Sequence, residues 1–154
     1  MILAILLTAQ TANLPPWTPL PMQGSAEAAV MAPINAMFAG LAARDSAAIL
    51  AQTRAEGGAT VANEKADGSR SIRHETWPEF AGGIKPGAER YEERISDPAI
   101  EIDGDIAMVW APFTFLIDGK VHHCGVNHFD LVREQGAWKV LNVTWSSRTT
   151  GCTG

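Results

Sequence analysis

The side chains best suited to chemistry are concentrated in one short segment, residues 122–130, which reads HHCGVNHFD. Within it, Asn127 carries two hydrogen-bond donors and one acceptor in an otherwise apolar context. A buried amide left unpaired costs about 1–3 kcal/mol. We therefore expect Asn127 to bond either to another protein group or to a ligand.

The histidines of this segment allow two acid–base arrangements. His128 and Asp130 lie two residues apart and would share one face of a strand, where a histidine with an orienting carboxylate can act as a base. A surface or interface pair is the more ordinary interpretation of the same residues. His122 and His123 alternate faces, so at most one is expected in a pocket, and His123 is the candidate unless it is solvated at the sheet rim. No metal-ligand spacing is present, and we predict neither a metal nor a cofactor.

The elements that must position these side chains form one predicted antiparallel sheet over residues 89–148. Turn signals at Asp103-Gly104, at Asp118-Gly119 and at Glu134-Gln135-Gly136 separate the strands. The predicted strands are 89–103, 105–117, 120–133 and 137–147. A bulge or edge is expected at Asp97-Pro98, because proline cannot join a regular central ladder.

The hairpin turns predict a register for this sheet. A two-residue turn at Asp118-Gly119 would pair Thr114 with His123 and Trp110 with Asn127, and a three-residue loop at Gly136 continues the same face onto the last strand. The residues predicted to share the face are Met108, Trp110, Thr114, His123, Asn127, Phe129, Leu131, Leu141, Val143 and Trp145. An apolar wall with a few polar groups is typical of a small-molecule pocket. The opposite face, with His128 and Asp130, is expected to meet solvent or a second copy, and a slip of one residue would exchange the two faces.

The first half of the domain is predicted to supply helices and a short hairpin. A helix capped by Ser25 presents Val30, Ile34 and Met37 on one apolar stripe, and Asp45 caps a second helix over 46–52. Strands are predicted at 57–64 and 70–74, followed by a short helix at 75–81. Further contributors to the pocket mouth are expected from Arg73, His74, Trp77 and the only tyrosine, Tyr91.

The N-terminus resembles an export signal. Residues 1–12, MILAILLTAQTA, combine a short apolar run with small residues but lack a basic segment. Residues 13–24 hold four prolines and are predicted to be a linker, so one domain is expected over 25–150. We expect a periplasmic or secreted protein, with a cytoplasmic one as the alternative. A membrane span is not expected, since it needs roughly 20 apolar residues.

Composition narrows the function classes. The chain has 154 residues, 46% of them hydrophobic and 19% charged, which suits one globular domain. Its net charge is −5 and no basic cluster is present, which argues against nucleic-acid binding. The two cysteines, Cys124 in a predicted strand and Cys152 in the tail, could pair after export or remain a buried thiol and a free one.

The order of elements, and several sequence stretches, resemble the nuclear transport factor 2-like superfamily over residues 26–148. The most specific stretches are Val109–Phe113, Asp118–Lys120, His123–Asn127 and Gly136–Val140. This resemblance implies an α+β fold in which a curved antiparallel sheet wraps around N-terminal helices, the cystatin-like cone with a central pocket. It is also found in ketosteroid isomerase, scytalone dehydratase and SnoaL-like cyclases.

The resemblance extends to an exported bacterial branch whose members commonly end in a short tail with a cysteine, here Cys152. The catalytic patterns of known members do not carry over. An isomerase-like site needs an acidic base with a tyrosine and a protonated acid, yet Tyr91 is alone and no acid lies on the predicted pocket strands. A dehydratase-like site needs a His–Asp pair inside the cone, and His128 and Asp130 are predicted to face away.

Three functions therefore remain. The first is a domain that binds a small, largely apolar molecule without catalysis. The second is a cofactor-independent lyase or isomerase with His123 or His128 as base and Asn127 as donor to an oxyanion. The third is a non-catalytic interaction module that forms a homodimer through the mixed face of the sheet.

Overall fold

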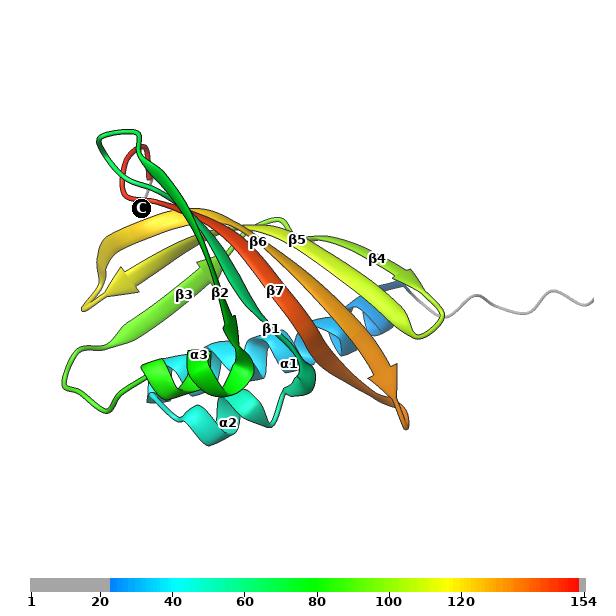
Figure 1. The fold of residues 1–154 in the computed structure, drawn as a ribbon. Helices are drawn as coiled ribbons and strands as arrows, with labels where there is room; N and C mark the ends of the chain where they lie inside the picture. The colour runs from blue at the N-terminus through cyan, green and yellow to red at the C-terminus, as the bar shows by residue number, and fades with distance from the viewer. Residues whose placement is uncertain (1–22, 153–154) are drawn as a thin grey trace, which may run out of the picture.

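The computed structural model describes residues 23–152, which form three helices and a seven-stranded sheet (Figure 1). The predicted signal at 1–12 and nearly all of the predicted linker at 13–24 lie outside the described residues. The helices are α1 (Gln23–Ala43), α2 (Ser46–Leu50) and α3 (Trp77–Gly83). The strands are β1 (Thr53–Glu64), β2 (Arg70–Thr76), β3 (Tyr91–Ile95), β4 (Ala99–Asp103), β5 (Ile106–Ile117), β6 (Lys120–Glu134) and β7 (Ala137–Arg148).

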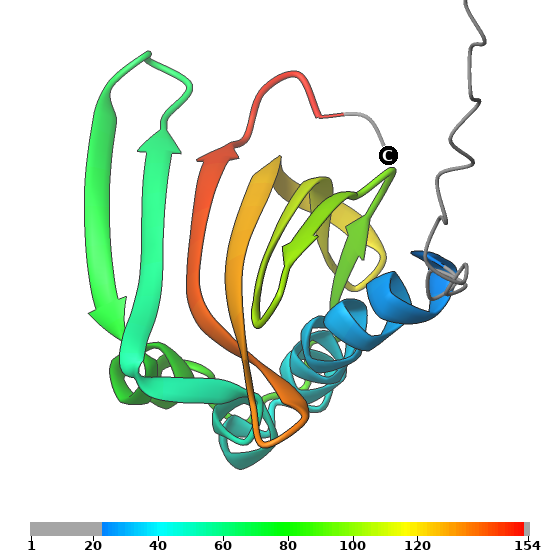
Figure 2. The same ribbon diagram turned by 90° about the vertical axis from the view of Figure 1, so that its right-hand side faces the viewer.

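The sheet is curved and mixed, with strand order β2-β1-β7-β6-β5-β3 and with β4 pairing the other half of β5. Only β1 and β7 run parallel; the remaining pairs are antiparallel. Figures 1 and 2 show the helices gathered on the concave side, with α1 lying across the strands and α2 and α3 at one end. The α+β cone expected from the sequence is confirmed, apart from the parallel β1–β7 pair.

The helix ends are explained by capping. Asp45 accepts a hydrogen bond from the Ala48 amide, as predicted, and Thr76 forms a capping box with Glu79. Pro78 falls in the first turn of α3, where proline is favoured, so this helix starts at Trp77 and not at residue 75. The expected cap at Ser25 is wrong, because α1 already begins at Gln23.

By length and composition α1 could cross a membrane, but the core helix of a soluble domain passes the same test. Here Val30, Ile34 and Met37 of α1 are buried in the core with Phe129 and Val143 of the sheet. These residues form one buried stripe of α1, whose apolar window is 28% buried as a whole, so packing accounts for that stripe.

The break between β3 and β4 falls where the sequence predicts it. Asp97 adopts a left-handed φ of 42° just before Pro98, and the Ser96 amide bonds to the Pro112 carbonyl. Proline cannot donate to the ladder, so β3 ends at Ile95 and β4 resumes pairing with β5 at Ala99.

The predicted register of both long hairpins is wrong, because each contains a bulge and because the second loop is shorter than predicted. Glu134 pairs with Ala137, so this loop has the two residues Gln135-Gly136 and not the predicted three. Phe115 pairs with His123 but Leu116 pairs with Val121, which leaves His122 as an extra residue on β6. A second irregularity lies between Leu131, which pairs with Val140, and Asp130, which pairs with Asn142.

The first bulge exchanges the two faces of β5. Asn127 pairs with Ala111 and not with Trp110, so Val109, Ala111 and Phe113 turn inward and are buried. Met108, Trp110 and Thr114, predicted to line the pocket, lie on the convex face instead. The inward residues of β6 and of the end of β7 are unaffected, because Phe129 pairs with Val143 and Asn127 with Trp145.

A disulfide joins Cys124 to Cys152, with Cα atoms 5.6 Å apart. Cys124 belongs to the convex side of β6, opposite Thr114, and is nevertheless buried. The tail after β7 therefore returns to the sheet and is tied to it covalently.

Candidate functional site

A cavity of about 400 Å³ lies between the concave face of the sheet and the three helices. Its aromatic walls are Phe38, Phe80, Tyr91, Phe113, Phe115, Phe129 and Trp145. Its aliphatic walls are Met37, Leu41, Ile49, Ile84, Ile117 and Val143. Four polar side chains complete it: Glu93, His122, His123 and Asn127. This is an apolar chamber with a small polar group on the sheet side, which suits a small organic ligand.

The polar centre of the cavity is a carboxyl–amide pair. Asn127 Nδ2 donates to Glu93 Oε1 over 2.6 Å, from the middle of β6 to β3. Burial raises the pKa of Glu93 to about 7, and the hydrogen bond from Asn127 opposes this rise only in part. Near neutral pH this carboxyl is divided between its two protonation states, as required of a general acid or base.

Two histidines form a second polar group beside it. The Nδ1 atoms of His122 and His123 are 2.9 Å apart, so one carries a hydrogen and donates to the other. Burial and the neighbouring His122 lower the pKa of His123 to about 4, which keeps this ring neutral. The prediction that at most one of the two enters the pocket is wrong, because His122 is the bulged residue and alternation fails there.

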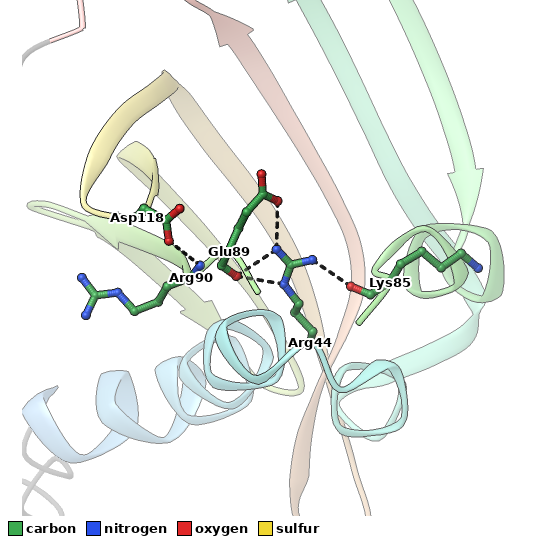
Figure 3. A network of polar contacts seen from close by, with 5 residues as sticks. All are labelled: Arg44, Lys85, Glu89, Arg90 and Asp118. Atoms are coloured by element: carbon green, nitrogen blue, oxygen red, sulfur yellow. Dashed lines mark hydrogen bonds and ion pairs between the residues drawn. The ribbon is translucent and has the colours of Figure 1, made fainter. Parts of the chain in front are cut away.

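The loop between α3 and β3, which contributes Ile84 to the cavity lining, is held by Arg44 (Figure 3). Its guanidinium donates to the carbonyls of Lys85 and Glu89 and pairs with the Glu89 carboxylate at 3.1 Å. It also lies 3.8 Å from the centroid of the Tyr91 ring, which lines the cavity. At the other end of the loop, Asp118 Oδ1 accepts from the Arg90 amide.

Arg44 occupies an unusual backbone position for this role. It has a left-handed φ of 54° and closes a Schellman motif, with its amide bonded to Leu41 and that of Asp45 bonded to Gly40. Glycine is the usual residue there. Gly87 in the loop leaves room for the Arg44 side chain, because a Cβ atom on residue 87 would lie 2.6 Å from the Arg44 guanidinium. The loop therefore packs closely against Arg44.

The structure brings together five of the residues predicted for the site: Tyr91, His123, Asn127, Phe129 and Trp145 all line the cavity. Met108, Trp110 and Thr114 do not, because of the bulge at His122. Trp110 is 51% exposed on the convex face.

The His128–Asp130 pair lies on the convex face, as the alternation of β6 predicts. His128 Nε2 is 3.5 Å from Asp130 Oδ1, and the His128 ring packs beside Trp110 with centroids 6.0 Å apart. These groups are partly open to solvent and outside the cavity, so they do not act on a molecule held there.

The contributors expected at the pocket mouth have other partners. The Trp77 ring is fully buried, and its Nε1 donates to the Leu141 carbonyl over 3.0 Å. Arg73 pairs with Glu75, and His74 Nδ1 lies 2.9 Å from Thr60 Oγ1. None of the three lines the cavity.

Glu93 is the residue that sequence reasoning missed, although a signal for it existed. Tyr91 was expected to line the pocket, and side chains two apart on a strand share a face, so Glu93 follows it inward. Phe113 and Phe115, which alternate with Thr114 on β5, also line the cavity. Among residues 23–152, no group of three or more His, Cys, Asp or Glu side chains is arranged to hold a metal ion.

Comparison with solved structures supports this fold. A cystatin-like protein of unknown function from Nostoc punctiforme superposes with a TM-score of 0.62 at 14% identity, over 85% of this chain and 97% of that one. A nuclear transport factor 2-like protein of unknown function from Shewanella baltica gives 0.60 at 15% identity, over 83% and 98%. One of the same description from Silicibacter pomeroyi gives 0.60 at 14%, over 83% and 100%.

No protein-family model matches the sequence, and no curated protein matches it either. At such low identities the likeness defines the fold alone. The fold is the nuclear transport factor 2-like cone, as the sequence resemblance implied, and it hosts many unrelated functions. The function must therefore be argued from the cavity.

Proposed function

We propose that this domain binds a small, largely apolar molecule in the cavity between the helices and the concave face of the sheet. The observation that carries the proposal is an apolar chamber of about 400 Å³ with Glu93 and Asn127 facing into it. Rigid strands hold these two polar groups, and Trp145 supplies a ring that would report on an occupant.

Native mass spectrometry of the full chain purified from a bacterial host tests this proposal. A bound small molecule should be retained by Trp110→Ala, which alters the convex face, and lost from Trp145→Ala, which opens the cavity wall. Circular dichroism should show that both variants fold. Equal retention by the two variants would place the ligand outside the cavity and contradict the proposal.

Catalysis is a second candidate, and Glu93 is the observation that favours it. As the free base at neutral pH, Glu93 could remove a proton beside a carbonyl, and Asn127 would hold the carboxylate in place. This is the cofactor-independent isomerase or lyase alternative, with Glu93 in place of His123 or His128 as base. Neutral His123 remains available as a hydrogen-bond donor or acceptor.

Exchange of the α-protons of 2-tetralone in D₂O, followed by NMR, tests this catalysis without knowledge of the substrate. Base catalysis predicts a faster exchange that is lost in Glu93→Gln and kept in Glu92→Gln, with a rate that rises through pH 7. Exchange at the solution rate with the native protein would remove this candidate.

A homodimer through the convex face is a further proposal. Trp110 and Ile106 are 51% and 60% exposed on β5, which is unusual for large apolar side chains. Sedimentation velocity should show a dimer that Trp110→Glu dissociates. A monomer at all concentrations would contradict it.

Export is proposed from two features together. The apolar N-terminal run resembles a signal, and the Cys124–Cys152 disulfide suits an oxidising compartment. Fractionation of cells that express the full chain should recover it outside the cytoplasm. Recovery in the cytoplasm with both thiols alkylatable would contradict export.

A further inference from the structure

The described cavity lining holds one acid, Glu93, without a lysine or arginine beside it. Its hydrogen-bond partner, Asn127, is a neutral amide. A carboxylate moved from water into apolar surroundings is costly without a partner of opposite charge. Near neutral pH this carboxyl is therefore partly protonated, and so partly neutral.

The protein's own cations near the cavity are committed elsewhere. Arg44 gives its donors to the loop carbonyls of Lys85 and Glu89 and to the Glu89 carboxylate. His123 is kept neutral, since its pKa is lowered to about 4. His122 also lines the cavity, where its Nδ1 lies 2.9 Å from His123 Nδ1, and the described lining offers Glu93 no lysine or arginine as a counter-charge.

The walls around Glu93 are the type that favours a cation. Phe115 is the cross-strand neighbour of Glu93, and its ring lies 5.4 Å from Tyr91 and 4.9 Å from His123, centroid to centroid. Phe113 adjoins the same cluster. Aromatic faces carry negative potential and attract an ammonium group, most strongly where water is excluded.

We propose that the cavity's occupant is an organic cation, a molecule with a positively charged nitrogen on an apolar body, whose nitrogen lies between the Glu93 carboxylate and the rings of Phe113 and Phe115. This proposal rests on the proposed function, since it names the chemical class that the cavity binds. A neutral carbonyl compound, as the proton-transfer alternative requires, would leave the carboxylate without a counter-charge.

Benzyltrimethylammonium and its neutral carbon analogue neopentylbenzene are the probes that isolate the charge, because they have nearly the same shape. Binding is measured by ligand-observed NMR and by the change in tryptophan fluorescence. At pH 8 the ammonium probe should bind at least about tenfold more tightly than the neutral probe. Glu93→Gln should remove this preference, so that the two probes bind with similar affinity.

The matched control is Glu92→Gln, which removes the same charge from the adjacent residue on the convex face, where Glu92 pairs with Arg94. The preference for the ammonium probe should survive it. Affinity for this probe should also fall about tenfold from pH 8 to pH 6, because burial holds the pKa of Glu93 near 7 and the bound cation requires the carboxylate.

The other titratable groups lining the cavity are Tyr91, His122 and His123. The pH dependence should therefore persist in His122→Gln and disappear in Glu93→Gln.

The outcomes separate the two proposals. Equal affinity for both probes, or a preference that persists in Glu93→Gln, overturns the organic cation and leaves a cavity that binds neutral molecules. Failure of both probes to bind contradicts the cation and the proposed binding function together. A preference lost only in Glu93→Gln supports both.

Discussion

Two neighbouring residues of β3, Glu92 and Glu93, show that the two faces of this sheet shift the pKa of the same side chain in opposite directions. Glu92 points to the convex face, where the Arg94 guanidinium at 2.6 Å lowers the pKa of its carboxyl. Glu93 points into the cavity, where burial raises its pKa to about 7. The histidines of β6 are also divided between the faces: burial lowers the pKa of His123 inside the cavity, while His128 lies beside Asp130 outside it. Residue type alone therefore does not locate the site, because the environment decides which groups are chemically poised.

The largest expected difference between the faces is in packing. Phe129 is 2% exposed on the concave face and Trp110 is 51% exposed on the convex face. Phe129→Ala should lower the free energy of unfolding by about 3–5 kcal/mol, whereas Trp110→Ala should change it by about 0.5 kcal/mol in the monomer. Urea denaturation of both variants measures this. Equal losses would mean that the convex face is also part of a core.

Cys124, on the convex face, is buried where the C-terminal tail is joined to it by the disulfide. Replacing Cys124 and Cys152 by serine removes a cross-link across 28 residues, with an expected loss of roughly 3–4 kcal/mol. Thermal unfolding of the double variant, compared with the oxidised and the reduced native protein, checks this value. If reduction of the native protein leaves its unfolding unchanged, the tail does not contribute to stability.

The two glutamates should differ in the pH dependence of stability. Because the pKa of Glu93 is raised from 4.5 to about 7, the folded state holds a proton between these values that the unfolded state has released. Stability should fall by up to roughly 3 kcal/mol as pH rises through this window, and level off above it.

Glu93→Gln should flatten this curve and be more stable than the native protein at pH 8, while Glu92→Gln should keep it. Urea titrations at pH 5, 6, 7 and 8 compare the three proteins. A native curve without a slope between pH 5 and 7 would show that Glu93 is solvated.

The smallest of these effects concerns the amide that supports Glu93. Asn127→Ala removes the 2.6 Å hydrogen bond, so the pKa of Glu93 should rise further and stability at pH 8 should fall by about 1–3 kcal/mol. His128→Ala, one residue along on the other face, should cost about 0.5 kcal/mol. NMR titration of the Glu93 carboxyl in Asn127→Ala gives the pKa directly, and a downward shift would contradict the hydrogen-bond assignment.

The sequence predicted the elements well but the inward faces of β5 and of the start of β7 badly. The turn at Asp118-Gly119, the cap at Asp45 and the break at Pro98 are local, so neighbouring residues determine them. The turn at Gly136 was predicted in place but one residue too long, since Glu134 pairs with Ala137. The bulge at His122 is not determined by neighbouring residues. It allows Phe129 on β6 and its partner strand residues Val109 and Ala111 on β5 to face inward together, and this requirement comes from the packing of the core.

The error in the site followed from that single residue. Asn127 and Phe129 were placed correctly because β6 alternates regularly from His123 onward. Trp145 was placed correctly because the shorter loop and the second bulge together shift its partner by two residues, which keeps the face. Trp110 and Thr114 were placed on the wrong side. Glu93 lies before the Pro98 break, outside the hairpins used to count the register. The alternation from Tyr91 could have revealed it, since no turn or bulge separates the two residues.

The bulge at His122 also has a consequence for how this protein can diversify. A point substitution in β5 changes one side chain of the cavity. A one-residue deletion beside the Asp118-Gly119 turn would remove the bulge and exchange the two faces of β5. Residues that now face inward, such as Phe113, would then compete for the concave face with residues that now face outward, such as Trp110. Length variation at this turn is therefore a second means of altering the cavity lining, beside exchange of single residues such as Glu93 within it.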